Sequence, residues 1–270
     1  MPDMYADITE VPTETLEMVV NVLELRAGDP RQVKMREAYF SHLDLPADAE
    51  VLESGCGPGP VSRHLAAHNA GWHVTGIDPS SHFIAKAREK AADTPNVDFV
   101  EGDARKLPFD DGTFDAVVFH TALCHIPDAA SAIGEAHRVL KSGGTIAIFD
   151  GDYATTSVAV GQHDPLQCCV ETMIDGNVHD KWFVRRAPKM LIAAGFEVSR
   201  ADGHSYLLLD EAAYLLTIFD RGTDAQAASE LIGGATAEAM KAEIRRRQEA
   251  GDFFGFIHFV SIIAQKDGAL

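Results

Sequence analysis

The chain has 270 residues, 46% hydrophobic and 24% charged, which is enough for one large α/β domain with insertions or for two small domains. Its 41 acidic residues outnumber its 23 basic ones and give a net charge of −18, and because such a surface repels phosphate groups, nucleic acid is disfavoured as a partner. The sequence has no run of the ~18 apolar residues that a membrane span needs and no signal-peptide core, so a soluble, cytoplasmic protein is expected. The spacing of its cysteines matches neither a zinc site nor a secreted disulfide framework, so free thiols are expected.

The first segment predicts two helices. Residues 12–26 repeat apolar side chains at i, i+3, i+4 and i+7, namely Leu16, Val19, Val20 and Leu23. A second helix is expected from Pro30 to about Leu43. Residues 1–45 are therefore expected to form an N-terminal helical lid.

From residue 50 the pattern alternates between short apolar runs and amphipathic stretches. The predicted strands are 50–54, 72–78, 97–103, 114–120 and 145–150. Three helices are predicted between them: one that ends near His68, one over 81–92 and one over 130–141. Such alternation indicates βαβ units and a parallel sheet. Ligands of these sheets bind outside the carboxyl ends of the strands.

The regular alternation of predicted strands and helices ends after Asp150. Residues 151–183 show no clear period and are interpreted as an insertion over the sheet. A helix closed by Gly195, a strand over 196–209, a helical stretch over 210–250 and a last strand in 253–266 follow. The last strand is apolar on both faces, as expected for a strand inside a sheet. The basic run Arg245 to Arg247 is interpreted as a solvated helix face.

The stretch VLESGCGPGP, residues 51–60, allows two interpretations. Its glycines at 55, 57 and 59 permit close approach of a ligand to the backbone. A dinucleotide fingerprint requires a third glycine where this chain has Pro60, and it does not include the acid Glu53. An NAD-dependent oxidoreductase is therefore disfavoured.

The same stretch resembles the first motif of class I S-adenosylmethionine (SAM)-dependent methyltransferases. The segments GIDPS, VEGDARKLPFDDGTFDAVV and HRVLKSGGTIAIFD are similar to later motifs, the second of them typical of the ubiquinone/menaquinone-biosynthesis-type subgroup. The resemblance covers about residues 48–150. It implies a Rossmann-like, seven-stranded, mostly parallel sheet with helices on both faces. Because the sequence has no repeats, low-complexity tracts or linkers, a single domain 1–270 is expected. That domain would have a SAM-binding core over 46–150 and helical cap insertions over the substrate site at 151–183 and 210–250.

The resemblance implies two acids at strand ends as cofactor ligands. Asp78, followed by Pro79, would accept hydrogen bonds from the ribose hydroxyls, and an alternative role is a helix N-cap. Asp103, with the Ala104 backbone beside it, would accept from the adenine amino group, and the alternative is a turn aspartate.

The glycine loop would hold the methionyl part of the cofactor. Gly55, Cys56 and Gly57 would lie against it, with Cys56 a small filler rather than a nucleophile, because nothing in the motif would activate the thiol. Glu53 would order the N–H groups of the loop or receive the ammonium group.

Candidate catalytic bases lie at the ends of the fourth and fifth strands. They are His120, which would also contact the cofactor, His125 and Asp152. Structural roles remain open for both histidines. Asp150 flanks the presumed pocket, and Tyr153, His179 and Trp182 would line it or pack the cap onto the core.

The sequence thus predicts an enzyme that methylates a small molecule, apolar and hydroxylated or quinone-like, with S-adenosylhomocysteine (SAH) as product. The alternative is a non-catalytic SAM- or SAH-binding sensor or scaffold. No metal site is expected, since Asp150 and Asp152 supply too few oxygen ligands. Monomer and homodimer both stay open.

Overall fold

The sheet is seven-stranded and mostly parallel, with the last strand inserted inside it, as the sequence predicts. The computed structural model describes residues 3–267, and in this part of the chain seven strands form one sheet in the order β3-β2-β1-β4-β5-β7-β6. The strands are β1 (Glu50–Ser54), β2 (His73–Asp78), β3 (Val97–Glu101), β4 (Phe114–His120), β5 (Leu140–Ser157), β6 (Phe196–Leu208) and β7 (Gly255–Lys266). β7 is antiparallel to both neighbours and the other pairs are parallel. The expected α/β fold class is confirmed.

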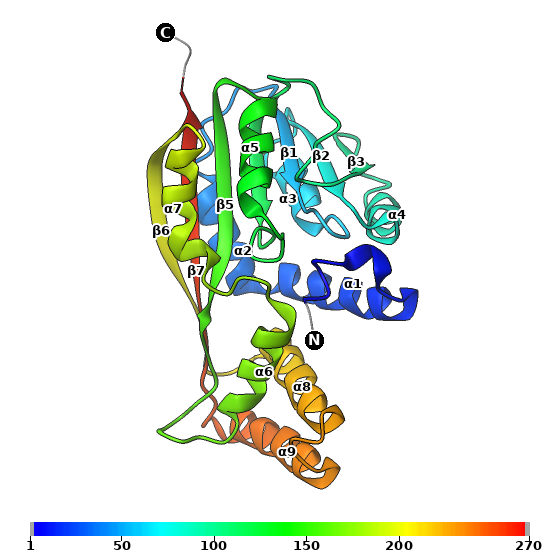
Figure 1. The fold of residues 1–270 in the computed structure, drawn as a ribbon, viewed down its shortest axis with the longest axis vertical. Coiled ribbons are helices and arrows are strands. Elements are labelled where there is room, and N and C mark those ends of the chain that lie inside the picture. The colour runs from blue at the N-terminus through cyan, green and yellow to red at the C-terminus, as the bar shows by residue number, and fades with distance from the viewer. Residues whose placement is uncertain (1–2, 268–270) are drawn as a thin grey trace.

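The helices cover the sheet and extend beyond one end of it. They are α1 (Thr13–Gly28), α2 (Pro30–Phe40), α3 (Pro60–His68), α4 (Ser81–Lys90), α5 (Ala129–Val139), α6 (Gln167–Asn177), α7 (Phe183–Ala193), α8 (Ala213–Ala228) and α9 (Gly234–Ala250), with a short 3-10 helix at Ile8–Glu10. In Figure 1, α5 and α7 lie over the face of the sheet turned toward the viewer, and α1 lies below β1, β2 and β3, where it contacts α3 and α4. None of the helices described between residues 3 and 267 has the length and apolarity to cross a bilayer.

The register of the central strands positions the site. β1 pairs with β2 on one side and β4 on the other, so that Glu53 lies opposite both Gly76 and Val118. Both central strands are almost completely buried, which explains their continuous apolar sequence. The side chains that follow the carboxyl ends of β1, β2 and β4 therefore meet at one edge of the sheet.

The expectation of an irregular insertion directly after Asp150 is wrong in its first part. β5 continues to Ser157, because the antiparallel strand β7 pairs with Asp150, Gly151 and Asp152 and again, after a register shift, with Ser157. Alternation in the sequence could not indicate this extension, since residues 150–153 are buried on both faces. The stretch 210–250 is helical as expected, but it is divided between α8 and α9.

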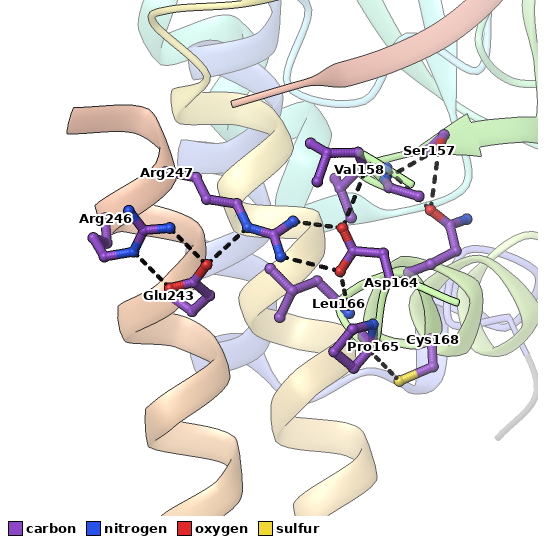
Figure 2. Close-up of polar contacts among 12 residues, drawn as sticks. Ser157, Val158, Asp164, Pro165, Leu166, Cys168, Glu243, Arg246 and Arg247 are labelled. Atoms are coloured by element: carbon purple, nitrogen blue, oxygen red, sulfur yellow. Dashed lines mark hydrogen bonds and ion pairs between the residues drawn. The ribbon is translucent and has the colours of Figure 1, made fainter. Parts of the chain in front are cut away.

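The segments after β5 and after β6 form one helical cap. α6, α8 and α9 lie together beyond the far end of the long strands (Figure 1), with α8 packed between α6 and α9. Figure 2 shows Arg247 of α9 reaching Asp164 in the loop before α6, with Nη1 to Oδ2 at 2.5 Å and Nη2 to Oδ1 at 3.2 Å. Arg247 is therefore a nearly buried clasp between the two cap segments, which corrects the interpretation of the whole basic run as a solvated face.

Candidate active site

The glycine loop turns tightly over the end of β2. The backbone N–H groups of Gly55 and Cys56 both donate to the carbonyl oxygen of Ile77, at 2.8 and 3.0 Å. Gly55 has φ of +79°, and a Cβ there would lie 2.7 Å from the Cβ of Ala122. Gly59 has φ of +76°, and α3 begins at Pro60 directly after it. The loop therefore needs glycine for its conformation and for its close approach to the chain after β4.

Asp78 presents a buried carboxylate beside this loop. Its Oδ2 accepts from the Gly57 N–H and its Oδ1 from the Ser80 N–H, both at 2.9 Å. Burial raises the pKa of Asp78 to about 6, although these two hydrogen bonds act in the opposite direction. Ser80, and not Asp78, caps α4. The second lone pairs of both oxygens stay available to hydroxyl donors.

Glu53 is buried at the end of β1 and also lines the cavity. Its carboxyl group accepts a hydrogen bond from the Ser62 hydroxyl of α3. Burial raises the pKa of Glu53 to about 8, while Ser62 and the charge of Arg36 lower it in part. Glu53 therefore links β1 to the first turn of α3 and can carry a proton near neutral pH.

Asp103 lies in a more exposed environment than Asp78. Its carboxylate pairs with Arg105, mainly through Nη2 to Oδ2 at 2.7 Å, and this hydrogen bond lowers the pKa of Asp103. Asp103 and the buried Ala104 both line the cavity, as does Pro79. The structure thus brings all the predicted cofactor residues to one place, while their individual roles stay predictions.

A cavity of about 280 Å³ lies at this edge of the sheet and is covered by the N-terminal segment. Tyr5, Ala6, Ile8 and Thr9 form part of its wall. Asp3 holds this segment in place, because its buried carboxylate accepts from the His179 backbone N–H and is bonded to His125 Nδ1, both at 2.8 Å. The segment therefore connects the core to the cap across the mouth of the cavity.

His120 ends β4 inside the cavity and is 5% exposed. Its Nδ1 is hydrogen bonded to the Tyr39 hydroxyl of α2 at 2.9 Å, and its ring stacks on Phe149 with centroids 4.6 Å apart. Burial, followed by the charges of Arg36 and Arg26, lowers the pKa of His120 well below 6.5. The ring is therefore neutral at physiological pH.

The other candidate bases occupy different environments. His125 lines the cavity but is engaged by Asp3 and lies against the Tyr5 ring, with centroids 4.5 Å apart. Asp152 is not part of the cavity wall, and its Oδ2 pairs with Arg185 Nε at 2.8 Å. Asp150 is buried, with its oxygens accepting from the N–H groups of Cys124 and Gly151. Catalytic roles for His125 and Asp152 stay predictions that these contacts do not favour.

The predicted cap residues Tyr153 and Trp182 line a second, polar cavity of about 240 Å³ between β5 and α6. His179 contacts the N-terminal segment through its backbone.

Burial raises the pKa of Cys56 well above 9, which agrees with the interpretation of this thiol as a filler. Within the described part of the chain, no three His, Cys, Asp or Glu side chains gather so that they could hold a metal ion.

Three residues of the site were not found by sequence reasoning. Tyr39 contacts His120, Thr121 follows it with φ of +53°, and Arg26 of α1 lines the cavity. Only Arg26 had a signal in the sequence. It follows Leu23 by three residues on the buried stripe of α1, where a charged side chain is unusual.

Comparisons with known proteins agree with this geometry. Residues 52–148 match the model of a family described as a methyltransferase domain. An uncharacterised 37.1 kDa protein in transposon TN4556 of Streptomyces fradiae is 26% identical over 91% of this chain and 71% of its own length. A sterol 24-C-methyltransferase of Eremothecium gossypii is 30% identical over 69% of this chain. A demethylmenaquinone methyltransferase of Staphylococcus epidermidis is 34% identical over 44% of this chain. These matches span 53% and 50% of the two enzymes, or about half their length.

Solved structures share the fold. A Bacillus halodurans protein superposes with a TM-score of 0.62 and 23% identity over 86% of this chain and 98% of its own. A phosphoethanolamine N-methyltransferase of Haemonchus contortus, solved with SAH, has a TM-score of 0.54 and 17% identity over 87% of this chain and 52% of its own. A structure described as the [4+2]-cyclase SpnF has a TM-score of 0.57 and 22% identity, covering 87% of this chain and 82% of its own. At these identities the likeness concerns the fold.

Proposed function

Because residues 52–148 form a methyltransferase domain of the class I SAM-dependent family, we propose that this protein transfers a methyl group from SAM to a small-molecule acceptor. The observation that carries the proposal is the convergence of the glycine loop, Glu53 and Asp78 on one cavity beneath the N-terminal segment. The match of the core domain to the family and the residues of this cavity together support this activity for the whole protein.

The residues of the cavity fit the cofactor. Asp78 is a buried carboxylate without a cationic partner in the described part of the chain, and two adjacent ribose hydroxyls would satisfy its free lone pairs. Gly55 and Gly57 have positive φ angles and lack side chains, which lets a ligand approach the loop backbone closely. When bound, SAM supplies an electrophilic methyl group on its sulfonium. The chain's task is then to align the acceptor and exclude water.

His120 is the residue best placed to take a proton from the acceptor. Its Nδ1 is occupied by Tyr39, so that Nε2 is the nitrogen available to a ligand in the cavity. Nε2 can accept a proton only in the tautomer in which Nδ1 carries hydrogen and donates to the Tyr39 oxygen. Burial keeps the Tyr39 hydroxyl protonated by raising its pKa, so either direction of this hydrogen bond is chemically available.

The acceptor is proposed to be apolar, with a hydroxyl group or a quinone-like ring. Apolar side chains from the N-terminal segment, α1, α4 and the turn after β4 line the cavity, namely Ile8, Leu23, Phe83 and Ile126. Relatives of the core domain include enzymes described as sterol and demethylmenaquinone methyltransferases. The N-terminal lid and the caps at 151–183 and 210–250 are proposed to complete the acceptor site.

The direct test is transfer of a labelled methyl group from SAM to a panel of phenols, quinols and sterols. Transfer to at least one acceptor, with formation of SAH, is the expected result. The proposal is contradicted if the protein binds neither SAM nor SAH. Tight binding without transfer to any panel member favours the alternative of a sensor or scaffold. Activity has to be measured because this fold also occurs in a protein described as a [4+2]-cyclase, and fold alone does not fix function.

A further inference from the structure

Arg26 is a cation inside the cavity that has no carboxylate partner among residues 3–267. It is on α1, and its Nη2 donates to the Thr121 hydroxyl at 2.6 Å. Arg26 is also hydrogen bonded to the Tyr214 side chain of α8, and among the described residues no Asp or Glu pairs with it. Most other arginines of this acidic chain have such a partner, as Arg63 has Glu24 and Arg105 has Asp103.

The groups around Arg26 do not compensate its charge. Its guanidinium lies over the Tyr214 ring of α8, 5.9 Å from the centroid, and Tyr5 and Tyr153 are also near enough to affect its charge. Burial raises the pKa of both Tyr5 and Tyr153 above 10, so these phenols are neutral at physiological pH. Arg26 is partly buried, and a cation that is partly removed from water is costly unless an anion or a set of hydrogen-bond acceptors satisfies it.

The chain holds Arg26 in this position at some conformational cost. Its partner Thr121 is a buried, β-branched residue with φ of +53°, a backbone conformation that such residues rarely adopt. The Thr121 hydroxyl donates to the His120 carbonyl oxygen at 2.7 Å and so presents its lone pairs to Arg26. Strained residues of this kind persist where surrounding structure imposes them, and they cluster at ligand sites.

We propose that Arg26 is a carboxylate-binding residue of this cavity. A guanidinium with unpaired N–H donors matches the two oxygens of a carboxylate, and the flanking phenols add hydroxyl donors. The inference deepens the proposed function and rests on it only for the identity of the cofactor. Two sources of the carboxylate share this chemistry, namely the amino acid end of the cofactor and an acidic group on the acceptor.

Arg26 lies between the regions of these two sources. Leu23, one helical turn before it, lies beside Gly57 of the loop that would hold the amino acid end of the cofactor, since a Cβ at Gly57 would be 3.4 Å from the Leu23 side chain. Tyr153 and Tyr214 belong to the end of β5 and to the cap, which are proposed to surround the acceptor. The experiment therefore needs one arm for each source.

The first arm compares SAH with its decarboxylated analogue, S-adenosyl-3-thiopropylamine, by calorimetry. If the carboxylate is that of the cofactor, Arg26→Gln should weaken SAH by about tenfold or more while leaving the analogue almost unchanged, and Arg26→Lys should restore part of the difference. Arg31→Gln is the matched control, because Arg31 is outside the cavity and pairs with Asp210.

The second arm uses the wild-type protein, so it does not depend on the folding of a variant. The side-chain Nε–H resonance of Arg26 is identified by its loss in Arg26→Lys, and acetate is titrated into the SAH complex with acetamide as the neutral control. A shift with acetate alone assigns the site to the carboxylate of an acceptor. An unchanged ratio of SAH to analogue affinity in Arg26→Gln, together with no acetate-dependent shift, overturns the proposal. Should the wild type not bind SAH, the proposed function fails, and acetate titrated into the free protein still tests Arg26.

Discussion

At the scale of single residues, burial decides which carboxyl groups of the site can bind neutral donors. Asp78 and Asp103 both follow strand ends and look equivalent in the sequence. Asp78 is 8% exposed and has no basic partner, whereas Asp103 is bonded to Arg105 at the rim. The pKa of Asp78 is raised to about 6, and that of Asp103 is lowered. Asp78 is therefore the acid whose ionisation a ligand can change.

Asp78→Asn tests this role. Loss of the ionised acceptor should weaken SAH by about 1–3 kcal/mol, or about tenfold or more, at pH 8. Wild-type affinity should also fall as the pH drops through about 6, where Asp78 takes up a proton, and the variant should lack this dependence. Calorimetry between pH 5 and 8 measures both effects. A folded variant with wild-type affinity at pH 8 contradicts the ribose assignment.

The raised pKa of Asp78 should also make the stability of the protein without ligand depend on pH. The folded pKa of Asp78 is raised above its ordinary value of 3.8, so its ionisation opposes folding increasingly as the pH rises from about 4 to about 6. Asp78→Asn removes this pH dependence, but its amide NH₂ group replaces one of the two oxygens that accept from the Gly57 and Ser80 N–H groups, which lowers stability at every pH. Urea unfolding between pH 3.5 and 8 should therefore show the unfolding free energy of the wild type falling relative to that of the variant as the pH rises.

His120→Ala tests the base. If Nε2 takes a proton from the acceptor, turnover should fall by about 100-fold while SAH still binds. Because the pKa of His120 lies well below 6.5, its protonation should not reduce kcat between pH 8 and 6.5. His125→Ala should mainly lower stability. If turnover instead depends on His125 or Asp152, the base is that residue, and if none of the three matters, the acceptor needs no base.

At the scale of elements, Asp3 fixes the N-terminal segment over the cavity. It accepts from the His179 N–H group and binds His125, so two contacts hold residues 3–10 there, and a third, with the Tyr5 N–H group, lies within the segment. We expect this segment and the cap 151–183 to close over bound cofactor, since methyl transfer benefits from exclusion of water. SAH should slow hydrogen exchange in both segments. Equal exchange with and without SAH points to a permanently open site.

Asp3→Ala should release this closure. The loss of several hydrogen bonds, each worth about 0.5–1.5 kcal/mol, should make SAH dissociate about fivefold faster or more. Asp7→Ala is the matched control, because Asp7 is exposed on the same segment and caps nothing with its side chain. Stopped-flow displacement measures the rate. Identical SAH dissociation rates from both variants contradict a role of Asp3 in holding the segment closed.

The cap should depend on the clasp between α9 and the loop before α6. Arg247→Met leaves the nearly buried Asp164 without its cation, which should cost about 1–3 kcal/mol of unfolding free energy and leave SAH affinity unchanged. Arg246→Met is the matched control, because Arg246 is adjacent, exposed and paired with Glu243 at the surface. We expect no measurable change in that variant. Equal Tm values for the two variants contradict the clasp.

At the scale of the whole molecule, cofactor identity is the property to measure. SAH at 100 times its Kd should stabilise the folded protein by about 2.7 kcal/mol and raise Tm, since it binds only the native state. NAD should have no effect, because Pro60 stands where a dinucleotide loop has glycine. Thermal denaturation with each ligand provides the comparison. Stabilisation by NAD and not by SAH contradicts the proposed function.

The elements could be predicted where local pattern and tertiary context agree. β1 and β4 are short apolar runs buried on both faces, and α5 has a regular buried stripe, so each was evident in the sequence. The extension of β5 to Ser157 was not, because it depends on hydrogen bonds from β7, about a hundred residues away in the chain. Non-local pairing of this kind leaves no periodic signal in either segment.

The sequence by itself determined the fold class, the glycine loop and the acids at the strand ends. It could do so because backbone conformation at Gly55 and Gly59 and the order of strands and helices depend on local residue types. Only the tertiary structure decided the state of His120, the pairing of Arg247 and the isolation of Arg26. Each of these depends on burial and on charges from distant segments, which set pKa values and hydrogen-bond partners but are not encoded in the neighbouring residues.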